Sequence, residues 1–483
     1  MAADTNIFPA LIAHCKEYGY IFPSSEIYDG LSAVYDYGQN GAQLKKHIRD
    51  YWWKSMTQLH ENIVGIDAAI FMHPTTWKAS GHVDSFSDPM IDNKDSNKRY
   101  RVDHLIETFA DELRASGVER DKERADQILS KMDELLTADD FDELKKLIEE
   151  NNIKCAVSGT SNWTDIRQFN LMFSTELGSV AEEASTIYLR PETAQGIFVN
   201  FLNVQKTGRM KIPFGIAQTG KAFRNEIVAR QFIFRMREFE QMEMQFFIRP
   251  GTQLEWYEYW KEKRLQWHKE IGIPAEKLRF HNHTKLAHYA DAALDIEFEF
   301  PFGWKELEGI HSRTDFDLSR HQEFSKKKLQ YFDNEINSNY IPYVVETSVG
   351  LDRLVLTVLS LAYKEEIWKK EDGRDDSRVL LKIPPKLAPY KLAVLPLVKK
   401  DGLPEIAKQI MNDCKASFHC FYEEKDSIGK RYRRMDAIGT PFCVTVDHQT
   451  KEDSTVTIRY RDSMLQERIG LTDVRKIVME KTI

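Results

Sequence analysis

Alternating apolar and polar positions between residues 235 and 248 predict a β-strand with two different faces. One face is apolar and suits a core: Met242, Met244, Phe246 and Ile248. The other mixes charged, amide and aromatic groups: Arg235, Arg237, Phe239, Gln241, Glu243 and Gln245. We expect Arg224 and Glu226 to share one face of a preceding antiparallel strand. A half-exposed hairpin is the commoner cause of such alternation, but the ordered mixture of guanidinium, ring and carboxylate favours a binding surface.

A second predicted hairpin carries carboxylates. Residues 295–300 and 304–309 alternate on either side of a Pro301-Phe-Gly303 turn. Strict alternation places Trp304, Glu306 and Glu308 on one face. Carboxylate oxygens are the ligands that Mg²⁺ prefers, and this ion keeps substrate phosphates in its coordination shell.

A third segment combines a polar strand with an apolar helix. On the strand predicted for residues 341–349, Glu346 and Ser348 face together. Gly350 ends the strand, and a helix from Leu351 to about Tyr363 places Arg353 in its first turn. An arginine supported by a helix N-terminus is a good anion site.

Helical periodicity marks three further stretches. Residues 8–18 and 42–59 are predicted helices of a core or an interface, and residues 105–152 form a charged, amphipathic helical insertion. Short strands and turns follow from Ile153, and a strand over residues 186–192 leads into a helix that opens at Thr193.

The C-terminal part has its own pattern. Strand-like and helical runs alternate after Pro384-Pro385, which predicts a small α/β sheet and a domain boundary at that pair. A charged linker is expected at residues 372–378. Residues 386–483 hold 18 Lys and Arg against 14 Asp and Glu, and residues 427–436 form a basic cluster, so this part is the better candidate to meet a polyanion.

Composition sets the limits. A chain of 483 residues is expected to form two or three domains. A net charge of −8 excludes a uniformly basic nucleic-acid binder. The five cysteines form no C-x-x-C pair, so we expect neither a structural zinc site nor a disulfide framework. The sequence has no apolar run long enough to span a bilayer, so we expect a cytoplasmic protein that does not associate with a membrane.

Two segments resemble motifs of the class II aminoacyl-tRNA synthetases. The string Phe223-Arg-Asn-Glu226, a loop, and then residues 235–243 resembles motif 2, in which the first arginine grips the α-phosphate of ATP and the phenylalanine stacks on adenine. Arg353 resembles the motif 3 arginine that holds the γ-phosphate. Arginine suits this task because its planar fork binds phosphate oxygens in bidentate fashion.

Other strings resemble the glycyl-tRNA synthetases of the homodimeric type. They are Tyr35-Asp-Tyr-Gly38, the Arg101-Val-Asp-His104 element, and Arg190-Pro-Glu-Thr-Ala-Gln195. The chain departs from the family at Gln39-Asn40, where a proline is expected after the glycine. The last domain resembles the anticodon-binding domain of the glycyl, threonyl, prolyl and histidyl enzymes.

The resemblance implies a mixed, mainly antiparallel sheet with flanking helices (class α/β, or α+β) plus a C-terminal α/β domain. It implies a catalytic domain over residues 1–383, with an insertion at about 84–165, and an anticodon-binding domain over residues 384–483. The implied activity is ligation of glycine to tRNA(Gly) through a glycyl-adenylate, with ATP, Mg²⁺ and a homodimer.

The resemblance also implies roles for individual residues. Arg224, Glu226 and Arg353 would be catalytic, and Glu306 would hold Mg²⁺. ATP would meet Arg224, Asn225, Glu226, Phe234, Arg235, Met236, Arg237, Glu238, Phe239, Glu306, Leu307, Gly350, Leu351, Asp352 and Arg353. Glycine would meet Arg101, Glu192, Phe239, Glu240, Gln241, Met242, Glu243, Glu346, Thr347, Ser348, Val349 and Gly350.

Three alternatives stay open at this point. The chain could be a synthetase for another amino acid, a paralogue that adenylates a non-tRNA acceptor, or a non-catalytic accessory subunit that binds nucleic acid. The glycyl-type strings speak against the first. Arg224, Glu226 and Arg353 speak against the last, since accessory relatives lose the phosphate-gripping arginines.

Overall fold

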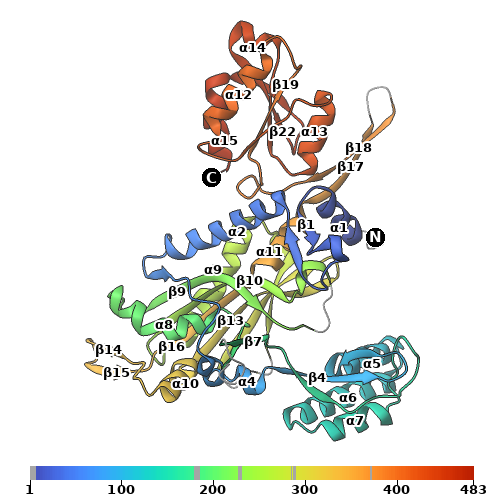
Figure 1. Cartoon of the computed structure of the whole chain (residues 1–483), viewed down its shortest axis with the longest axis vertical. Coiled ribbons are helices and arrows are strands. Elements are labelled where there is room, and N and C mark those ends of the chain that lie inside the picture. The colour runs from blue at the N-terminus through green and yellow to red at the C-terminus, as the bar shows by residue number, and fades with distance from the viewer. Residues whose placement is uncertain are drawn as a thin grey trace.

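The computed structural model describes residues 7–178, 185–226, 231–283, 286, 290–369 and 373–482. A central body is built on a seven-stranded sheet (Figure 1). A second sheet domain lies at one end of this body, and a group of helices lies at the opposite end.

The strands of the central sheet follow the order β11-β12-β13-β16-β10-β9-β3. Every neighbouring pair is antiparallel except β3 with β9. The bounds are β3 Ile63–Gly65, β9 Phe214–Phe223, β10 Glu238–Ile248, β11 Leu278–Asn282, β12 Ala292–Phe300, β13 Gly303–Thr314 and β16 Tyr343–Gly350. This confirms the predicted mainly antiparallel sheet.

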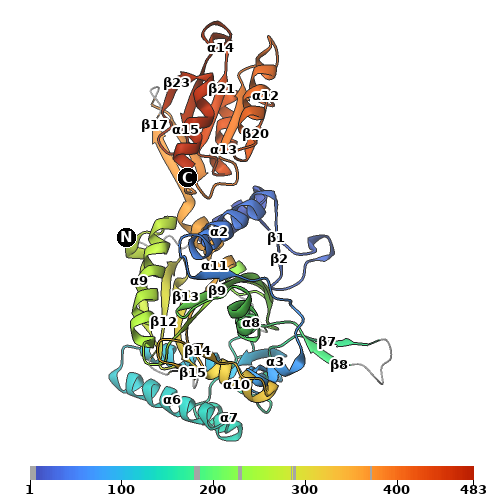
Figure 2. The same ribbon diagram turned by 90° about the vertical axis from the view of Figure 1, so that its left-hand side faces the viewer.

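Helices cover both faces of the sheet (Figure 2). One face packs against α1 Ile7–Glu17, α2 Gln39–Thr57, α9 Gln253–Ile271 and α11 Leu351–Ala362, and the other against α8 Ala194–Thr207 and α10 Phe316–Ser325. The alternation predicted for β10 is confirmed. Met242, Met244 and Phe246 enter the first core, whereas Phe247 packs on the α8 side.

The strands that flank the motif 2 loop are shorter than predicted. β9 ends at Phe223 and β10 begins at Glu238, so Arg224, Glu226 and Arg235 lie beyond the ladder. One more backbone bond, from Arg224 N–H to Arg237 O (2.9 Å), continues the pairing before the chains separate. The expectation that Arg224 and Glu226 share a strand face is therefore wrong, because both residues belong to the loop.

A β-bulge in β13 changes the predicted faces of its carboxylates. Ile296 pairs with Glu308 and the next residue, Glu297, pairs with Glu306, which leaves Leu307 as the extra residue. Leu307 and Glu308 both face the α9 side, where Glu308 binds Arg264. Glu306 faces the opposite side. The expected common face of Glu306 and Glu308 is therefore wrong, since an inserted residue shifts the alternation by one.

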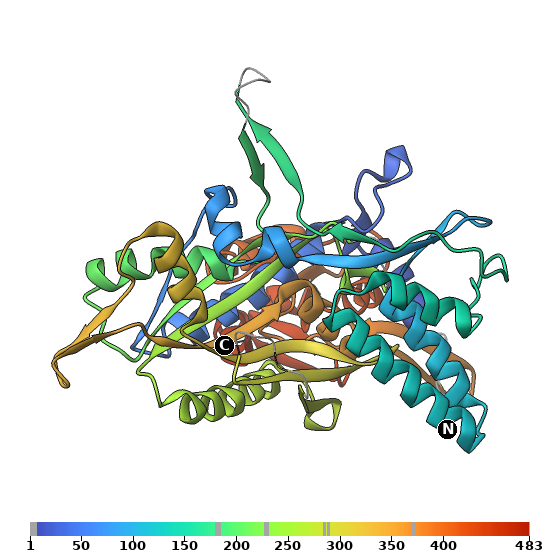
Figure 3. The ribbon, with the colours of Figure 1, turned by 90° about the horizontal axis from the view of Figure 1, so that it is seen from below.

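The insertion is confirmed as helical, with a small sheet at its base. Its strands are β4 Ser87–Asn93, β5 Lys98–Arg101 and β6 Arg167–Asn170, and its helices are α5 Val102–Ala115, α6 Glu119–Thr137 and α7 Phe141–Glu150. Ile106, Leu144 and Trp163 belong to a core of its own. Next to it, β7 Ser174–Leu177 and β8 Ser185–Tyr188 pair in a hairpin that projects from the body in a different direction from the helices (Figure 3).

Short elements connect the larger ones. They are β1 Ile21–Pro23, β2 Tyr35–Tyr37, α3 Pro74–Ala79, α4 His82–Ser85, β14 Tyr331–Asp333 and β15 Ser338–Tyr340, with single 3-10 turns η1 Glu26–Tyr28, η2 Phe232–Phe234, η3 Ala275–Lys277 and η4 Leu471–Asp473.

The C-terminal domain is a five-stranded sheet of order β20-β19-β21-β22-β23 with its own apolar core. Its elements are β19 Leu392–Pro396, α12 Leu403–Cys414, β20 Cys420–Tyr422, α13 Ile428–Ala437, β21 Phe442–Val446, α14 His448–Asp453, β22 Thr455–Tyr460, β23 Gln466–Gly470 and α15 Val474–Thr482. The predicted α/β alternation is confirmed. The basic cluster lies on α13, where Arg433 and Arg434 are paired with acidic residues.

The linker expected at residues 372–378 is wrong where the structure describes it. Residues 375–378 belong to β18 Asp375–Leu381, which pairs with β17 Tyr363–Lys369, and Asp372 lies outside the described residues. The charges that suggested a linker instead pair with α13 of the C-terminal domain: Arg378 binds Asp436, and Asp376 binds Arg433. No helix among the described residues is long and apolar enough to cross a membrane.

Candidate active site

A cleft of about 460 Å³ opens on the α8 side of the sheet, where β10, β13 and β16 lie side by side. Segments that are far apart in the sequence meet in it. The predicted site residues that line it are Arg101, Glu192, Arg224, Glu226, Phe234, Arg235, Met236, Phe239, Glu240, Gln241, Glu243, Glu306, Glu346, Ser348, Gly350, Asp352 and Arg353.

The cationic end of the cleft is formed by Arg224, Phe239, Glu306 and Arg353. The guanidinium carbon of Arg224 lies 5.4 Å from the ring centre of Phe239 and 5.3 Å from that of Phe86. Its Nε donates to the carbonyl of Pro191 at 3.0 Å. Across the described part of the chain no carboxylate forms an ion pair with Arg224, so its terminal N–H groups are available to an anion.

Arg353 reaches the same end from the first turn of α11. Its Nη1 lies 2.9 Å from Glu306 Oε2, and its guanidinium carbon lies 4.4 Å from the ring centre of Phe234. The charge of Arg353 lowers the pKa of the Glu306 carboxyl against the effect of burial, with a smaller contribution from Arg224. Glu306 is therefore ionised, and the two arginines converge near one carboxylate.

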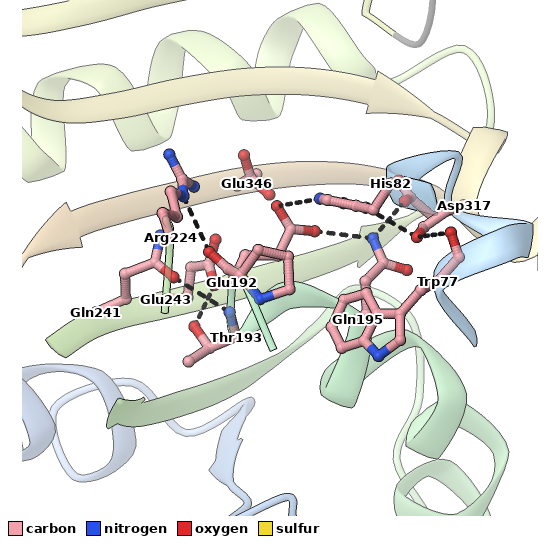
Figure 4. A network of polar contacts seen from close by, with 12 residues as sticks. Trp77, His82, Glu192, Thr193, Gln195, Arg224, Gln241, Glu243, Asp317 and Glu346 are labelled. Carbon is pink, nitrogen blue, oxygen red and sulfur yellow. Dashed lines mark hydrogen bonds and ion pairs between the residues drawn. The ribbon is translucent and has the colours of Figure 1, made fainter. Parts of the chain in front are cut away.

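The acidic end holds three carboxylates: Glu192, Glu243 and Glu346 (Figure 4). Glu346 is 4% exposed and accepts from Gln245 Nε2 at 2.6 Å. It also contacts His311 Nδ1 at 2.8 Å and Arg313 Nη1 at 3.2 Å.

Glu192 has a different set of partners. Gln195 Nε2 donates to its Oε1 at 3.0 Å, and His82 Nε2 lies 3.4 Å from its Oε2. Glu243 accepts a hydrogen bond from the Thr193 hydroxyl. The structure thus gives two of the carboxylates a cationic or potentially cationic neighbour at short range.

These surroundings separate the pKa values of the three groups. Burial raises the pKa of Glu243 to about 8, because the charges of Glu346 and Glu192 add to the cost of removing it from water. Burial acts in the same direction on the other two, but His82 lowers the pKa of Glu192, and Arg313 with His311 lowers that of Glu346. Near neutral pH these surroundings therefore favour the protonated form of Glu243 and the ionised forms of Glu192 and Glu346.

Backbone and side-chain contacts fix the segment that carries Glu192. Arg190 is 2% exposed and donates from Nε to Lys221 O (2.7 Å) and from Nη1 to Ala68 O (2.8 Å). Its guanidinium packs on Gly220, where an added Cβ would lie 2.2 Å from Nη2. Gln218 Nε2 donates to Thr193 O at 2.7 Å. The segment is therefore held by β9 on both sides of Glu192.

Some predicted residues line the cleft but have structural partners. Asp352 is 2% exposed; it accepts from Tyr37 OH, from Lys45 Nζ at 2.7 Å and from Glu240 N–H at 2.7 Å. Glu240 pairs with Lys45 (3.3 Å) and Arg49 (2.8 Å). Asp352 therefore ties the Tyr35-Asp-Tyr-Gly38 segment to β10 and α11, next to Arg353.

Other predicted residues have side chains that do not line the cleft. They are Asn225, Arg237, Glu238, Met242, Leu307, Thr347, Val349 and Leu351. Met242, Leu307, Val349 and Leu351 are in the core, Glu238 pairs with Lys221, and Arg237 donates to Glu226 O. For Glu238, Met242, Thr347 and Val349 the reason is the two-residue period of the strands, which turns every second side chain away.

Sequence reasoning missed several residues of the cleft: Phe86, Asp88, Leu171, Ile233, Gly309, His311 and Arg313. Gly309, His311 and Arg313 continue the alternation of β13 after the bulge, so extending that pattern could have found them. His82 and Asp317 support the acidic end from α4 and α10, and no local pattern marks them.

The antiparallel sheet, with two arginines of separate segments converging over it, defines the catalytic core of a class II aminoacyl-tRNA synthetase. Family models agree: the tRNA synthetase class II core domain (G, H, P, S and T) matches residues 173–362, and the anticodon binding domain matches residues 391–481. The glycyl-tRNA synthetase insertion domain 1 matches residues 88–122 and 115–171.

Full-length relatives narrow this class. The chain is 55% identical over 472 residues to the glycine–tRNA ligase of Chlorobaculum tepidum. This match covers 98% of this chain and 99% of the relative. The chain is 50% identical over 467 residues to that of Treponema denticola (96% and 94%) and 50% identical over 469 residues to that of Borreliella burgdorferi (96% and 95%). The chain belongs to the glycine–tRNA ligase family.

Proposed function

We propose that the cleft activates glycine with ATP and transfers the glycyl group to tRNA(Gly). The observation that carries this proposal is the pairing of an arginine-lined end with a small, buried acidic end in one cleft. A nucleotide triphosphate is polyanionic and matches the first. The ammonium group of an amino acid without a side chain matches the second.

The first step needs positioning and charge neutralisation more than side-chain acids or bases. A carboxylate oxygen of glycine attacks the α-phosphorus, and the bond from that phosphorus to the bridging oxygen breaks as pyrophosphate leaves. Arg224 binds the α-phosphate, Arg353 and Arg235 bind the γ-phosphate, and Phe239 stacks on adenine. Glu226 and the Phe234–Met236 segment border the nucleotide.

The second step transfers the glycyl group. A ribose hydroxyl at the tRNA 3′ end attacks the carbonyl carbon of the adenylate, the bond to the phosphate oxygen breaks, and AMP leaves. Glu192, Glu243 and Glu346 hold the glycine ammonium, with Arg101, Gln241 and Ser348 at the edge of that pocket. Residues whose side chains face the core, such as Val349, contribute through the backbone.

Mg²⁺ fits the donor set of the cationic end. Glu306 is an ionised carboxylate beside both arginines, and Mg²⁺ in phosphate sites takes one or two protein carboxylates and several non-protein oxygens. Glu306 would hold it there, where it would neutralise phosphate charge. The described residues gather no group of three or more His, Cys, Asp or Glu side chains that suits a metal by itself.

We further infer a catalytic domain over residues 1–383, with the insertion at about 84–165, and an anticodon-binding domain over residues 384–483. Basic side chains of the latter would meet phosphates, with unpaired anticodon bases read by stacking and base edges. We propose a homodimer that acts in the cytoplasm, with α2 at the subunit interface.

Aminoacylation of total tRNA with each amino acid in turn tests the proposal. We expect charging with glycine alone, and only of tRNA(Gly). Charging with a different amino acid would show that glycine is not the substrate. Glycine-dependent exchange of pyrophosphate into ATP without charging of any tRNA would favour an acceptor other than tRNA.

A further inference from the structure

A chain of buried polar contacts joins the two ionised carboxylates of the acidic end through Gln195, Asp317 and Arg313. Gln195 Nε2 donates to Glu192 Oε1 and to Asp317 Oδ1, both at 3.0 Å. Arg313 then bonds Asp317 through Nε (2.8 Å) and Nη2 (3.1 Å). Its remaining amino group, Nη1, bonds Glu346 Oε2 at 3.2 Å. Figure 4 shows Glu192, Gln195 and Asp317 in this order.

The central members of this bridge are almost completely buried. Gln195 is 0%, Asp317 2% and Arg313 7% exposed. His321 fixes the orientation of the Gln195 amide, because its Nε2 lies 2.8 Å from Gln195 Oε1. Burial lowers the pKa of His321, so the ring is neutral and donates from Nε2 to this oxygen. The Gln195 N–H groups are thereby left to face the two carboxylates.

Like charges make such a bridge necessary. Glu192 and Glu346 are both ionised and repel each other in a buried pocket, where water screens them weakly. A rigid connection through the Gln195 amide and the bidentate Arg313 fork opposes their separation. Only a pocket of fixed width can refuse a larger amino acid, since a glycine site gains nothing by contacting an absent side chain.

We propose that Asp317 is a positioning residue that holds Glu192 and Glu346 at a fixed separation and so restricts the acidic end to an amino acid without a side chain. The inference rests on the proposed function for the identity of the ligand. Asp317 touches no substrate; it acts through Gln195 on one carboxylate and through Arg313 on the other. A pocket that distinguishes two substrates by one methyl group gives a ratio of kcat/KM values of about 10 to 200. We expect the preference for glycine over alanine to depend on the bridge.

The test compares Asp317→Asn with Asp436→Asn in the full chain. Asp436 is also buried and also pairs with arginine, in its case with both Arg378 and Arg459, but it lies in the C-terminal domain. Pyrophosphate exchange is measured with glycine and with alanine. For Asp317→Asn we expect the KM for glycine to rise about tenfold or more with kcat within a few-fold, and the glycine-to-alanine ratio of kcat/KM to fall about tenfold.

Asp436→Asn should lower thermal stability without changing this ratio. Gln195→Met keeps every charge and the side-chain length, and it serves where Asp317→Asn does not fold; we expect the same fall in the ratio. A glycine-to-alanine ratio that stays at the unmodified value in both bridge variants overturns the inference. Failure of the unmodified chain to activate glycine is a separate result, which overturns the proposed function as well.

Discussion

The two ends of the cleft are built in opposite ways. At the cationic end, the Arg224 side chain makes one hydrogen bond within the described residues, to a backbone carbonyl, and Arg353 and Glu306 retain side-chain exposures of 23% and 49%. At the acidic end, the side chains of Glu346 and Arg313 are 5% and 8% exposed, and each makes several polar contacts. A large polyanion brings its own charge to the first. Under the proposed function, the second would have to be complete before a ligand as small as glycine arrives.

Because of this difference, substitutions at the two ends should affect activity and stability to different degrees. Among the described residues the Arg224 side chain makes one hydrogen bond, so its replacement should remove the proposed ligand contacts and little else. Side chains at the acidic end compensate one another, and loss of one leaves a buried charge without its partner. Substitutions at the two ends should therefore give different combinations of rate and melting temperature.

The largest expected effect is that of Arg224→Ala. It removes a preorganised positive charge from the cationic end and should lower glycine-dependent pyrophosphate exchange by roughly 100- to 1,000-fold, or about 3–4 kcal/mol of barrier. The melting temperature should stay unchanged. Arg279→Ala is the matched control, because Arg279 belongs to the same sheet and pairs at the surface with Glu297. Retention of most of the exchange activity would remove Arg224 from the proposed role.

A smaller effect, on both properties, is expected for Glu346→Gln. It leaves Arg313 and His311 without one counter-charge and should lower the free energy of unfolding by about 2–3 kcal/mol. The KM for glycine should rise in parallel. Chemical denaturation measures the first quantity and pyrophosphate exchange the second. Glu335→Gln, which removes a surface pair with Arg249, should cost less than about 1 kcal/mol. Equal losses in the two variants would contradict the comparison.

The smallest effect concerns the proton on Glu243. Since the folded state raises the pKa of this carboxyl to about 8, the empty protein loses stability as pH rises from the ordinary glutamate value toward 8. Glycine brings an ammonium group and favours the ionised form, so its dissociation constant should fall by up to about tenfold per pH unit over the same range. Binding measured by calorimetry between about pH 6 and pH 9 checks this dependence. Glu243→Gln should abolish it and stabilise the empty protein at neutral pH; an unchanged pH profile would contradict the assignment.

Period-two alternation predicted much of the cleft. It placed Gln241 and Glu243 together on β10 and Glu346 with Ser348 on β16, because alternate side chains of an unbroken strand point to the same face. It failed for Glu308, since one extra residue in β13 reverses the faces and nothing in the local composition reveals the insertion. Only the pairing of β13 with β12 identifies Leu307 as the bulged residue.

The supports of the acidic end could not be predicted. His82, Gln195 and Asp317 come from α4, α8 and α10, and their contacts depend on how three separate helices pack. The prediction of a linker in the charged stretch before the C-terminal domain was wrong for a related reason. Its residues resemble a solvated linker until β18 pairs with β17 and Arg378 becomes buried against Asp436.

Two contacts of residues 14 and 20 have a consequence for the order in which the molecule assembles. His14 contacts Ala437 O at 2.8 Å, and Tyr20 donates to Ile438 O at 2.9 Å, across separations of 423 and 418 residues. A ribosome therefore releases one half of this contact long before the other half exists. Contacts of such long sequence separation close late and slowly. This contact between the two sheet domains should thus form in one of the last events of folding, through residues that were made long before their partners.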